Sequence, residues 1–372
     1  MTAARFVFRL LAAAALAGAL ALPALAEFTP SGKLEIHYIN VGQGGSTLII
    51  GPNGTRILYD FGAVSGAQDI VPYLNDTLDL APQQGLHYTF VSHRDKDHYF
   101  GYSEVVKAGY DVRVANYAPD STKVVSSMMR KNWLDPAKKL TTAGAVKEPP
   151  VGLRIALGDG AELIVVAVNG RILGNRKPIK VKNENDRSIS LLVKYGKFRY
   201  VLDGDLGAGK ETCTAHDTTQ LGVQTHVARA LIAEGLIEPS RGVDVLHVAH
   251  HGSESSTSAA YYNLMKPEVG LISVGLNQGS FLHPREDVVD KVLIGNQRAG
   301  CVTAPPLQAL FQTEDGLKGC SSTGCTSFTG LSIGDIKLVT DGQRDYAVSG
   351  NNRVHGGKRE APQDKTWRFS LH

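Results

Sequence analysis

The sequence predicts an α/β protein built as a four-layer αββα sandwich, in which two sheets pack together and helices cover their outer faces. Three observations predict this fold. Short apolar segments typical of strands occur in two groups, and helical segments close each group. Polar side chains directly follow several of these strands, where α/β folds place their sites. Glycine is abundant, with 40 of 372 residues, which favours short elements and tight turns over long helices.

The first group of elements begins at Leu34. Residues 34–41 have the composition of a strand, and the glycines at 42–45 require a turn before β character resumes. Asn53-Gly54 is a hairpin signal, so the next strand turns back on the one before it. The remaining expected elements are strands at 47–50, 55–59 and 88–91 and helices at 68–78 and 123–133.

The second group begins near residue 153 and ends near residue 347. Apolar runs predict strands at 153–156, 162–168, 188–195, 198–202, 243–248, 269–274 and 308–313, with further β-rich residues at 331–347. Longer periodic segments predict helices at 218–234, at 257–265 and up to about residue 293. We therefore expect one folded domain over residues 27–348, followed by a polar C-terminal tail at 349–372 that is rich in Gly, Asn and Lys.

Residues 1–26 are predicted to form a cleavable signal peptide. Arg5 and Arg9 precede an apolar run at 10–22, and Ala24-Leu25-Ala26 fits a cleavage site. The run is shorter than the roughly 20 residues of a membrane-spanning helix, and no later segment is apolar enough to span a membrane. The mature chain is therefore expected in the periplasm or outside the cell. Losing the two arginines lowers the formal net charge from +3 to +1, which argues against tight nonspecific DNA binding.

The predicted export determines which redox environment the four cysteines would meet. Cys213, Cys301, Cys320 and Cys325 would meet an oxidising compartment, so up to two disulfides are expected, with three pairings left open. A zinc site at Cys320 and Cys325 is the alternative. No second Cys or His pair lies beside them at zinc-finger spacing, so we favour disulfides.

A motif directly after the apolar strand at 88–91 predicts a metal site. His93-x-Asp95-x-Asp97-His98 places four ligand-type side chains within six residues. Isolated Asp residues in this position could instead cap a helix. A calcium EF-hand loop would need a Gly and a later Glu that the sequence does not supply. The density of ligands therefore favours metal.

More distant residues can complete such a site. Asp205 follows the strand at 198–202, and His250-His251 follow the strand at 243–248. A phosphate-binding loop is a competing interpretation of Gly204-x4-Gly209-Lys210, but Glu211 stands where that motif needs Ser or Thr. The sequence also lacks the serine elbow and the zincin helix of other hydrolases.

Seven segments, taken in order, resemble the metallo-β-lactamase superfamily, and within it the branch that includes the C-terminal hydrolase domain of competence protein ComEC. They are "INVGQGGSTLI", "ILYDFG", "FVSHRDKDHYFG", "NDRSISLLV", "YVLDGD", "VLHVAHHGSESS" and "LISVGLNQGSFLHP", and they span roughly residues 34–345. The resemblance implies the αββα fold and a brace at Asp60. It also implies His93 and Asp95 as ligands of a first ion, Asp97 and His98 as ligands of a second, Asp205 as bridging carboxylate, and His250 or His251 to complete the second position.

The sequence departs from this pattern at three places. Asp95 stands where most of the superfamily has His, which leaves Mn²⁺ as an alternative to the expected Zn²⁺, with one or two ions bound. No His occurs between His98 and His216, so the middle His ligand is missing, and Asn185 stands near its position. Gly45 replaces the Asp that closes the "VGQGD" motif of the branch.

The expected activity is that of an exported metallohydrolase acting on phosphodiester bonds, in nucleic acid or in the cell envelope. Metal-bound hydroxide would attack, Asp205 would orient it, and His251 or His283 would protonate the leaving group. A basic segment, 171–199, carries nine Lys and Arg against Glu184 and Asp186. It is either a solvated surface or a rim for an anionic substrate, with Asn185, Lys180, Lys182 and Arg187 as candidate contacts.

Two alternatives remain open at this point. The chain could hydrolyse a carboxylic ester, a lactone or a lactam, or it could be an inactive sandwich that binds metal or a partner. The sequence identifies no protein partner.

Overall fold

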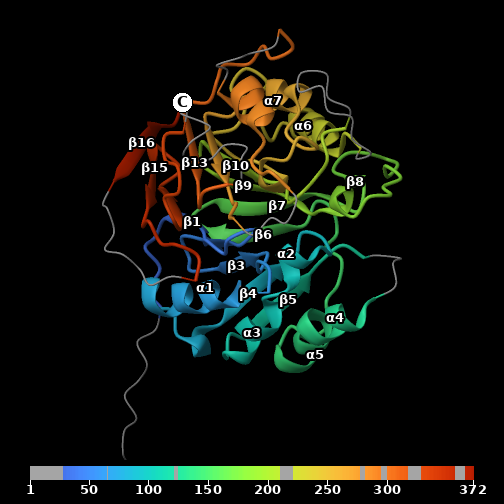
Figure 1. Ribbon diagram of the computed structural model, residues 1–372, viewed down its shortest axis with the longest axis vertical. Helices are drawn as coiled ribbons and strands as arrows, with labels where there is room; N and C mark the ends of the chain where they lie inside the picture. The colour runs from blue at the N-terminus through green and yellow to red at the C-terminus, as the bar shows by residue number, and fades with distance from the viewer. Residues whose placement is uncertain are drawn as a thin grey trace, which may run out of the picture.

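Two eight-stranded sheets pack face to face, and helices cover the outer face of each (Figure 1). The computed structural model describes residues 28–64, 66–120, 125–209, 221–276, 281–294, 300–316, 328–356 and 365–372. The two packed sheets, with helices on both outer faces, confirm the predicted αββα sandwich.

The first sheet combines strands from both parts of the chain. Its strands are β1 (Leu34–Tyr38), β2 (Thr47–Ile50), β3 (Arg56–Tyr59), β4 (Leu86–Phe90), β5 (Val112–Tyr117), β14 (Ile336–Thr340), β15 (Asp345–Gly350) and β16 (Thr366–Ser370). They lie in the order β16-β15-β14-β1-β2-β3-β4-β5. Strands β3, β4 and β5 are parallel, so their carboxyl ends share one edge of the sheet.

The second sheet is built from the middle of the chain. Its strands are β6 (Arg154–Gly158), β7 (Ala161–Val168), β8 (Arg171–Ile172), β9 (Ser190–Tyr195), β10 (Phe198–Leu202), β11 (Val245–His247), β12 (Val269–Ile272) and β13 (Ala309–Gln312). They lie in the order β13-β12-β11-β10-β9-β7-β6, and β8 pairs with β7. Strands β10 to β13 are parallel, and their carboxyl ends also share one edge.

Helices form the two outer layers (Figure 1). The first sheet is covered by α1 (Ala67–Pro72), α3 (Tyr102–Lys107), α4 (Ser127–Met129) and α5 (Asp135–Leu140), with the π-helical segments η1 (Tyr73–Thr77) and η3 (Arg130–Leu134). The second is covered by α6 (Val223–Ala233), α7 (Ala259–Met265) and the π-helical segment η6 (Asp287–Leu293). Four short helices complete the set among the described residues, namely α2 (Lys96–Tyr99) and the 3₁₀ turns η2 (Pro82–Gln84), η4 (Asn185–Arg187) and η5 (His250–Gly252).

The helix predicted at 123–133 is displaced in the structure. The helical residues are 127–140, divided among α4, η3 and α5. Pro136 lies in the first turn of α5, where it needs no backbone hydrogen bond, so it continues the helical path that the prediction ended too early.

The alternation of apolar residues along the strands builds the layers. Ile57 and Tyr59 of β3 face the core between the sheets, whereas Leu58 faces the outer helices. In β9, Leu191 belongs to the same inner core and Leu192 packs toward α6. Successive side chains of a strand point to opposite faces, so strands that are apolar on both faces require a helix layer on each sheet.

The C-terminal residues correct the prediction of a polar tail at 349–372. Strand β16 pairs with β15 along its length, from Asp345 opposite Ser370 to Ser349 opposite Thr366. Trp367 and Phe369 alternate with exposed residues and pack on Phe311. The prediction is wrong for these residues, because the polar composition belongs to the solvent face of an amphipathic edge strand.

Several predictions fall on other parts of the chain. The predicted signal peptide, residues 1–26, lies outside the described residues, as do Cys213, Cys320 and Cys325. Cys301 is disulfide-bonded, which agrees with the expected disulfides and leaves the pairing open. Among the described residues, no helix combines the length and the hydrophobicity needed to cross a membrane.

Candidate metal centre

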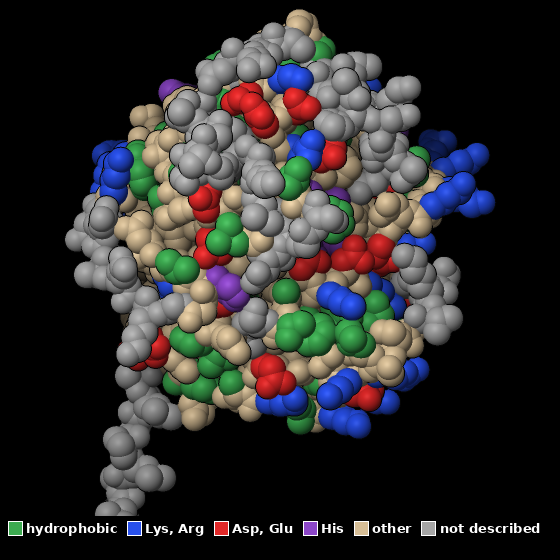
Figure 2. All heavy atoms as spheres, viewed as in Figure 1, with side chains coloured by type: hydrophobic (Ala, Val, Ile, Leu, Met, Phe, Trp, Pro, Cys, Tyr) green, Lys and Arg blue, Asp and Glu red, His purple; other side chains and the backbone are tan. Residues whose placement is uncertain are grey.

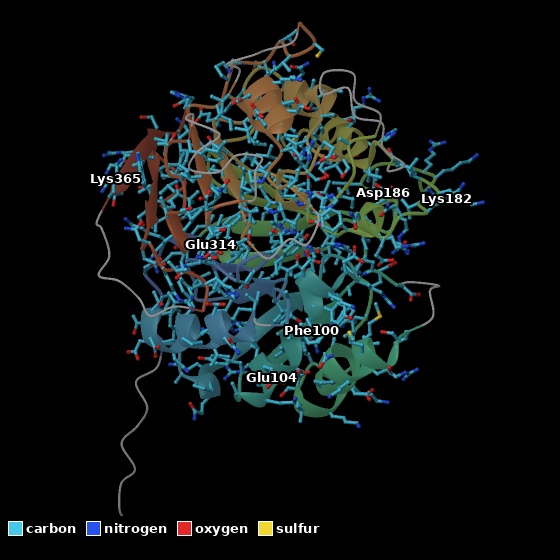
Figure 3. All side chains as sticks on the ribbon, viewed as in Figure 1. Phe100, Glu104, Lys182, Asp186, Glu314 and Lys365 are labelled. Atoms are coloured by element: carbon cyan, nitrogen blue, oxygen red, sulfur yellow. The ribbon has the colours of Figure 1, made fainter. Side chains whose placement is uncertain are left out.

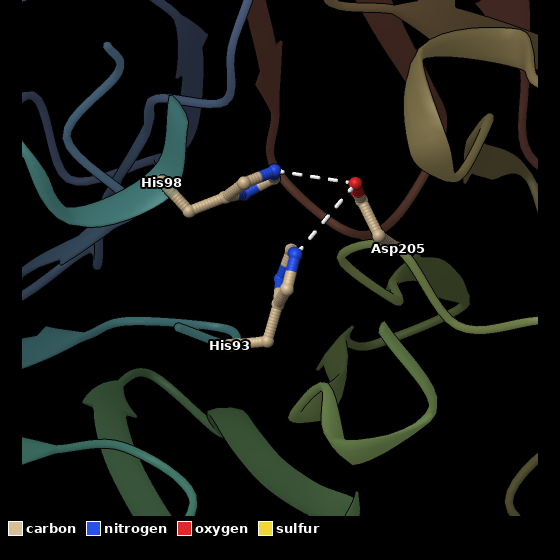
Figure 4. Close-up of side chains that lie close together, drawn as sticks. All are labelled: His93, His98 and Asp205. Carbon is tan, nitrogen blue, oxygen red and sulfur yellow. Dashed lines mark ion pairs between the residues drawn. The ribbon is translucent and has the colours of Figure 1, made fainter. Parts of the chain in front are cut away.

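The candidate ligands and their brace, Asp60, lie on four loops that follow strands β3, β4, β10 and β11. These strands contribute Asp60, the motif at 93–98, Asp205 and the pair His250-His251, respectively. Because the first two strands belong to one sheet and the last two to the other, the loops meet where the sandwich brings both sets of carboxyl ends together. Figure 4 shows the imidazoles of His93 and His98 approaching the Asp205 carboxylate from the opposite sheet.

One carboxylate oxygen is the meeting point of four imidazoles. Asp205 Oδ2 lies 3.3 Å from His98 Nε2 and 3.8 Å from each Nε2 of His93, His250 and His251. Ligands about 2.0–2.1 Å from a tetrahedral ion are roughly 3.3 Å apart, so these separations suit side chains that share ions.

Two groups of three side chains could each hold a metal ion. His93, His98 and Asp205 form one, and Asp97, His98 and His251 form the other, with all ligand atoms of a group within 4.8 Å of one another. Asp97 Oδ2 lies 3.4 Å from His251 Nε2. The structure therefore places His251, and not His250, with Asp97 and His98.

Asp95 lies at the exposed side of this cluster. Its Oδ2 is 3.4 Å from His93 Nε2, and its side chain is 50% exposed. All seven predicted ligands thus gather at one place, and their role in binding metal stays a prediction.

Acceptors behind two of the imidazoles fix which nitrogen faces the centre. His98 Nδ1 lies 2.8 Å from Asp60 Oδ2, and His251 Nδ1 lies 2.7 Å from the carbonyl oxygen of Ser273. A carboxylate and a carbonyl only accept, so both rings donate from Nδ1 and turn Nε2 toward the centre. Asp60 also accepts from the Ser92 amide at 2.6 Å, so it lies where the resemblance places the brace.

Buried atoms without partners show that a cation fits this centre. Among the described residues, His93 Nε2, His98 Nε2, His251 Nε2 and Asp205 Oδ1 are buried and have no hydrogen-bond partner. Leaving such atoms unsatisfied costs free energy, and binding a divalent ion removes that cost. Imidazole nitrogens with carboxylate oxygens are a donor set that Zn²⁺ accepts, and the carboxylates also suit Mn²⁺.

The carboxylates and imidazoles of the cluster shift each other's pKa values toward the charged forms. Burial raises the pKa of Asp205, but His98, His250 and His251 outweigh it and hold that pKa well below its usual range. Conversely, burial lowers the pKa of His98, but Asp205, Asp60 and Asp97 raise it well above the ordinary histidine value. The carboxylates are therefore ionised and attract positive charge.

The turn at residues 184–186 joins three of the ligand loops, a role of Glu184 and Asp186 that the sequence did not predict. Glu184 Oε1 accepts from the Arg94 amide at 3.2 Å, inside the motif. Asn185 Nδ2 lies 3.4 Å from His250 Nε2. Asp186 accepts from the amides of Gly207 at 3.3 Å and Leu221 at 2.9 Å, just beyond Asp205. The sequence signals at this turn were Asn185, near the position of the missing His ligand, and two acidic residues within a basic segment.

The candidate substrate residues are placed differently from one another. Asn185 lies beside His250, whereas Arg187 hydrogen-bonds Asn169 and lies 3.7 Å from Glu184. Lys180 and Lys182 are exposed, and Lys182 projects outward from the edge of the molecule in Figure 3. Of these four residues, Asn185 is the one that the structure brings to the ligand cluster.

His283 lies next to the pair that follows β11. It is buried, and its ring centroid is 5.4 Å from that of His250 and 6.2 Å from that of His251. Phe281 also stacks on His283, with ring centroids 5.6 Å apart, and is largely exposed. His283 therefore contacts both the histidine pair and an exposed aromatic ring.

Sequence comparison finds two curated relatives. Recombination protein 2 of Haemophilus influenzae is 27% identical over 248 residues, which are 65% of this chain and 24% of the relative. ComE operon protein 3 of Bacillus subtilis is 22% identical over 276 residues, which are 70% of this chain and 30% of the relative. The matched region is thus less than a third of each relative. No family model matches the chain.

The paired sheets, the ligand loops at their shared edge and these relatives agree with the resemblance read from the sequence. The chain has the metallo-β-lactamase fold. Solved structures of this fold that align with it include YhfI of Bacillus subtilis, with 10% identity and a TM-score of 0.38 over 65% of this chain and 86% of that one. Human tRNase Z, short form, aligns with 12% identity and a TM-score of 0.36 over 65% and 92%.

Proposed function

We propose that this metallo-β-lactamase-fold chain is a metal-dependent hydrolase of phosphodiester bonds, in nucleic acid or in the cell envelope. The observation that carries the proposal is the convergence of buried, partnerless Nε2 atoms on Asp205, with Asp97 beside them. A cluster that is costly without a cation and lies at strand ends is typical of a catalytic centre.

In this proposal the cluster holds one or two divalent ions, Zn²⁺ or Mn²⁺, and His98, which belongs to both groups, is a ligand of one ion only. A bound ion supplies Lewis acidity, which lowers the pKa of water and stabilises charge that develops on oxygen. The ionised Asp205 carboxylate accepts a hydrogen bond from the attacking water and orients it. In this proposal His251 is a ligand through Nε2, while its Nδ1 donates to the Ser273 carbonyl, and it is not the proton donor.

His283 is placed to contact the substrate oxygen that leaves. Burial, and then His251 and His250, lower its pKa to about 3, so the ring is neutral at pH 7. A neutral imidazole can hydrogen-bond an oxygen but is not charged. In this proposal His283 positions substrate or product, and its role in proton transfer stays a prediction.

Two observations favour a phosphodiester as substrate. Arg176, Lys177, Lys180 and Lys182 are exposed on the segment after β8. Figure 2 shows basic side chains at the edge of the face on which acidic side chains and histidine gather. Lys and Arg bind nucleic acid by neutralising phosphates, and one relative bears the name Recombination protein 2.

Export to the periplasm or the exterior is part of the proposal. It depends on the predicted signal peptide at 1–26. The disulfide at Cys301 supports it, because such bonds persist in oxidising compartments.

The test measures metal content and turnover in the parent, Asp97→Ala and Asp205→Ala, with exposed Asp76→Ala as matched control. Metal is counted by mass spectrometry, and the substrates are bis(4-nitrophenyl) phosphate and a chromogenic β-lactam. We expect the control to match the parent and the two site variants to lose metal and at least about 100-fold of phosphodiester turnover. Turnover of the lactam alone would favour the second class of hydrolase, and bound metal without turnover would favour a binding sandwich. Equal background rates in metal-free parent and variants would overturn the proposal.

A further inference from the structure

We infer that His250 and His251, adjacent in the chain, are divided between two metal positions. His251 serves the position with Asp97 and His98, and His250 serves the position with His93, Asp95 and Asp205. His250 would thereby replace the middle histidine that this chain lacks. The inference rests on the metal binding of the proposed function but not on its substrate.

The backbone of the pair is the first observation. His250 and His251 have φ angles of 54° and 55°, so both lie in the left-handed region. Residues other than glycine adopt this conformation rarely, at a cost of order 1–3 kcal/mol each, and such strain concentrates at functional sites. Two successive residues in this conformation therefore need a structural or functional explanation.

The reason is visible in where the rings point. In an extended strand, two consecutive side chains would face opposite sides. Here both Nε2 atoms lie 3.8 Å from the same oxygen, Asp205 Oδ2, although the ring planes are 69° apart. The strained backbone thus aims two neighbouring imidazoles at one carboxylate from different directions.

Hydrogen bonds also prepare His250 as a ligand. The Asn185 amide nitrogen can only donate, so at 3.4 Å it meets an Nε2 that accepts. The ring proton then lies on Nδ1, which donates to Ser255 Oγ at 2.9 Å. The Nδ1 proton is thus placed as at His251, and the Nε2 lone pair, which here accepts from Asn185, becomes available to an ion when that long hydrogen bond opens.

The grouping of ligands decides which position each histidine serves. His251 belongs to the compact group with Asp97 and His98. His250 contacts Asp205 and Asn185 and belongs to neither compact group. We therefore expect the ion at the His250 position to bind more weakly than the ion held with His251.

The experiment counts ions and measures affinity on the full chain after removal of metal by a chelator. Zn²⁺ is titrated by calorimetry, and bound zinc is counted by mass spectrometry. The parent, His250→Ala, His251→Ala and Asn185→Ala are compared with His226→Ala, which removes an exposed imidazole of α6.

We expect two ions in the parent, in the His226→Ala control and in Asn185→Ala. His250→Ala should weaken only the weaker ion, by at least about 10-fold, and His251→Ala should weaken the tighter one by a similar factor. Two ions with parental affinities in His250→Ala would overturn the inference. A parent that binds one ion, with an affinity unchanged in His250→Ala, would overturn it as well.

A second variant separates ligation from folding. His250→Gly accommodates a positive φ without strain. We expect its melting temperature in chelator to equal or exceed that of the parent while its affinity for the weaker ion falls. Unchanged affinity in this variant would again contradict the inference. A chain that binds two ions as described but hydrolyses neither substrate would refute the proposed function and leave the division of the histidines intact.

Discussion

At the scale of single residues, Asp60 has two tasks in the ligand loop. One oxygen accepts from the Ser92 amide and the other accepts from His98 Nδ1. The carboxylate therefore fixes both the path of the loop and the nitrogen that His98 presents to the centre.

We predict that Asp60→Asn weakens zinc binding by about 10- to 100-fold. The new amide can still accept from Ser92, but it presents an NH₂ group to His98 and favours the tautomer with a proton on Nε2. Calorimetric titration of Zn²⁺ measures the change, with Asp76→Asn as an exposed control. Parental affinity in Asp60→Asn would show that the brace does not set the tautomer.

At the scale of elements, the segment between β15 and β16 ties the C-terminus to α1. Arg353 Nη2 lies 2.6 Å from Asp69 Oδ1, and both side chains are buried. Arg353 Nη1 lies 3.5 Å from Asp335 Oδ1, and the Arg353 carbonyl accepts from Asn40 Nδ2 at 2.8 Å. The segment therefore also contacts the turn that follows β1.

We predict that Arg353→Ala lowers the free energy of unfolding by about 3–5 kcal/mol, because it removes the guanidinium that pairs with the buried Asp69 and Asp335 carboxylates and leaves only the His355 contact to Asp69 among these ion pairs. Chemical denaturation of the metal-free protein measures this change. The exposed Arg344→Ala provides the control and should shift stability by no more than about 0.5 kcal/mol. Equal effects of the two substitutions would mean that the pair is not a structural tie.

His355 makes the same segment sensitive to pH. A hydrogen bond from Nδ1 to Asp69 Oδ2 at 2.7 Å raises its pKa, and Glu314 adds to this effect while burial and Arg353 oppose it. Because the pKa is higher in the folded state, the stabilisation is complete below about 6.5, the unfolded value, and is lost as pH rises through the folded pKa.

We predict that His355→Gln is less stable than the parent at pH 5.5 and that the difference shrinks as the pH rises toward 9. Denaturation series at several pH values measure the difference directly. A difference that is constant with pH would show that protonation of His355 does not contribute.

The elements show what the sequence could predict. Strands such as β3 and β4 were predictable, because their apolar residues stand before Asp60 and the motif at His93. β16 was not predicted, because Trp367 and Phe369 alternate with polar residues and the average composition of the segment is polar. The partner of Asp97 among the two histidines also escaped prediction, because it depends on the φ angles of His250 and His251 and not on residue type.

At the scale of the whole molecule, the candidate centre draws on both sheets. The motif follows β4 of the first sheet, and Asp205 and His251 follow β10 and β11 of the second. An ion held by side chains from both sheets binds the folded sandwich and not its separated halves.

We predict that metal raises the melting temperature of the parent in proportion to the logarithm of its concentration. At 100 times the dissociation constant, the gain in unfolding free energy is about 2.7 kcal/mol. Thermal melts with Zn²⁺ and with chelator measure this gain, and Asp205→Ala should lose most of it. A similar rise in Asp205→Ala would indicate that metal binds elsewhere.

Strand β1 has its two neighbours at opposite ends of the chain. β2 follows β1 directly in the chain, but the other partner of β1 is β14. Leu34 therefore cannot pair with Thr340 until about 300 more residues have been synthesised. While the ribosome makes the protein from its N-terminus, one side of β1 has no native partner until almost the entire polypeptide has emerged. An unpaired strand edge can pair with other chains, so we expect the incomplete protein to be most prone to aggregation during that interval.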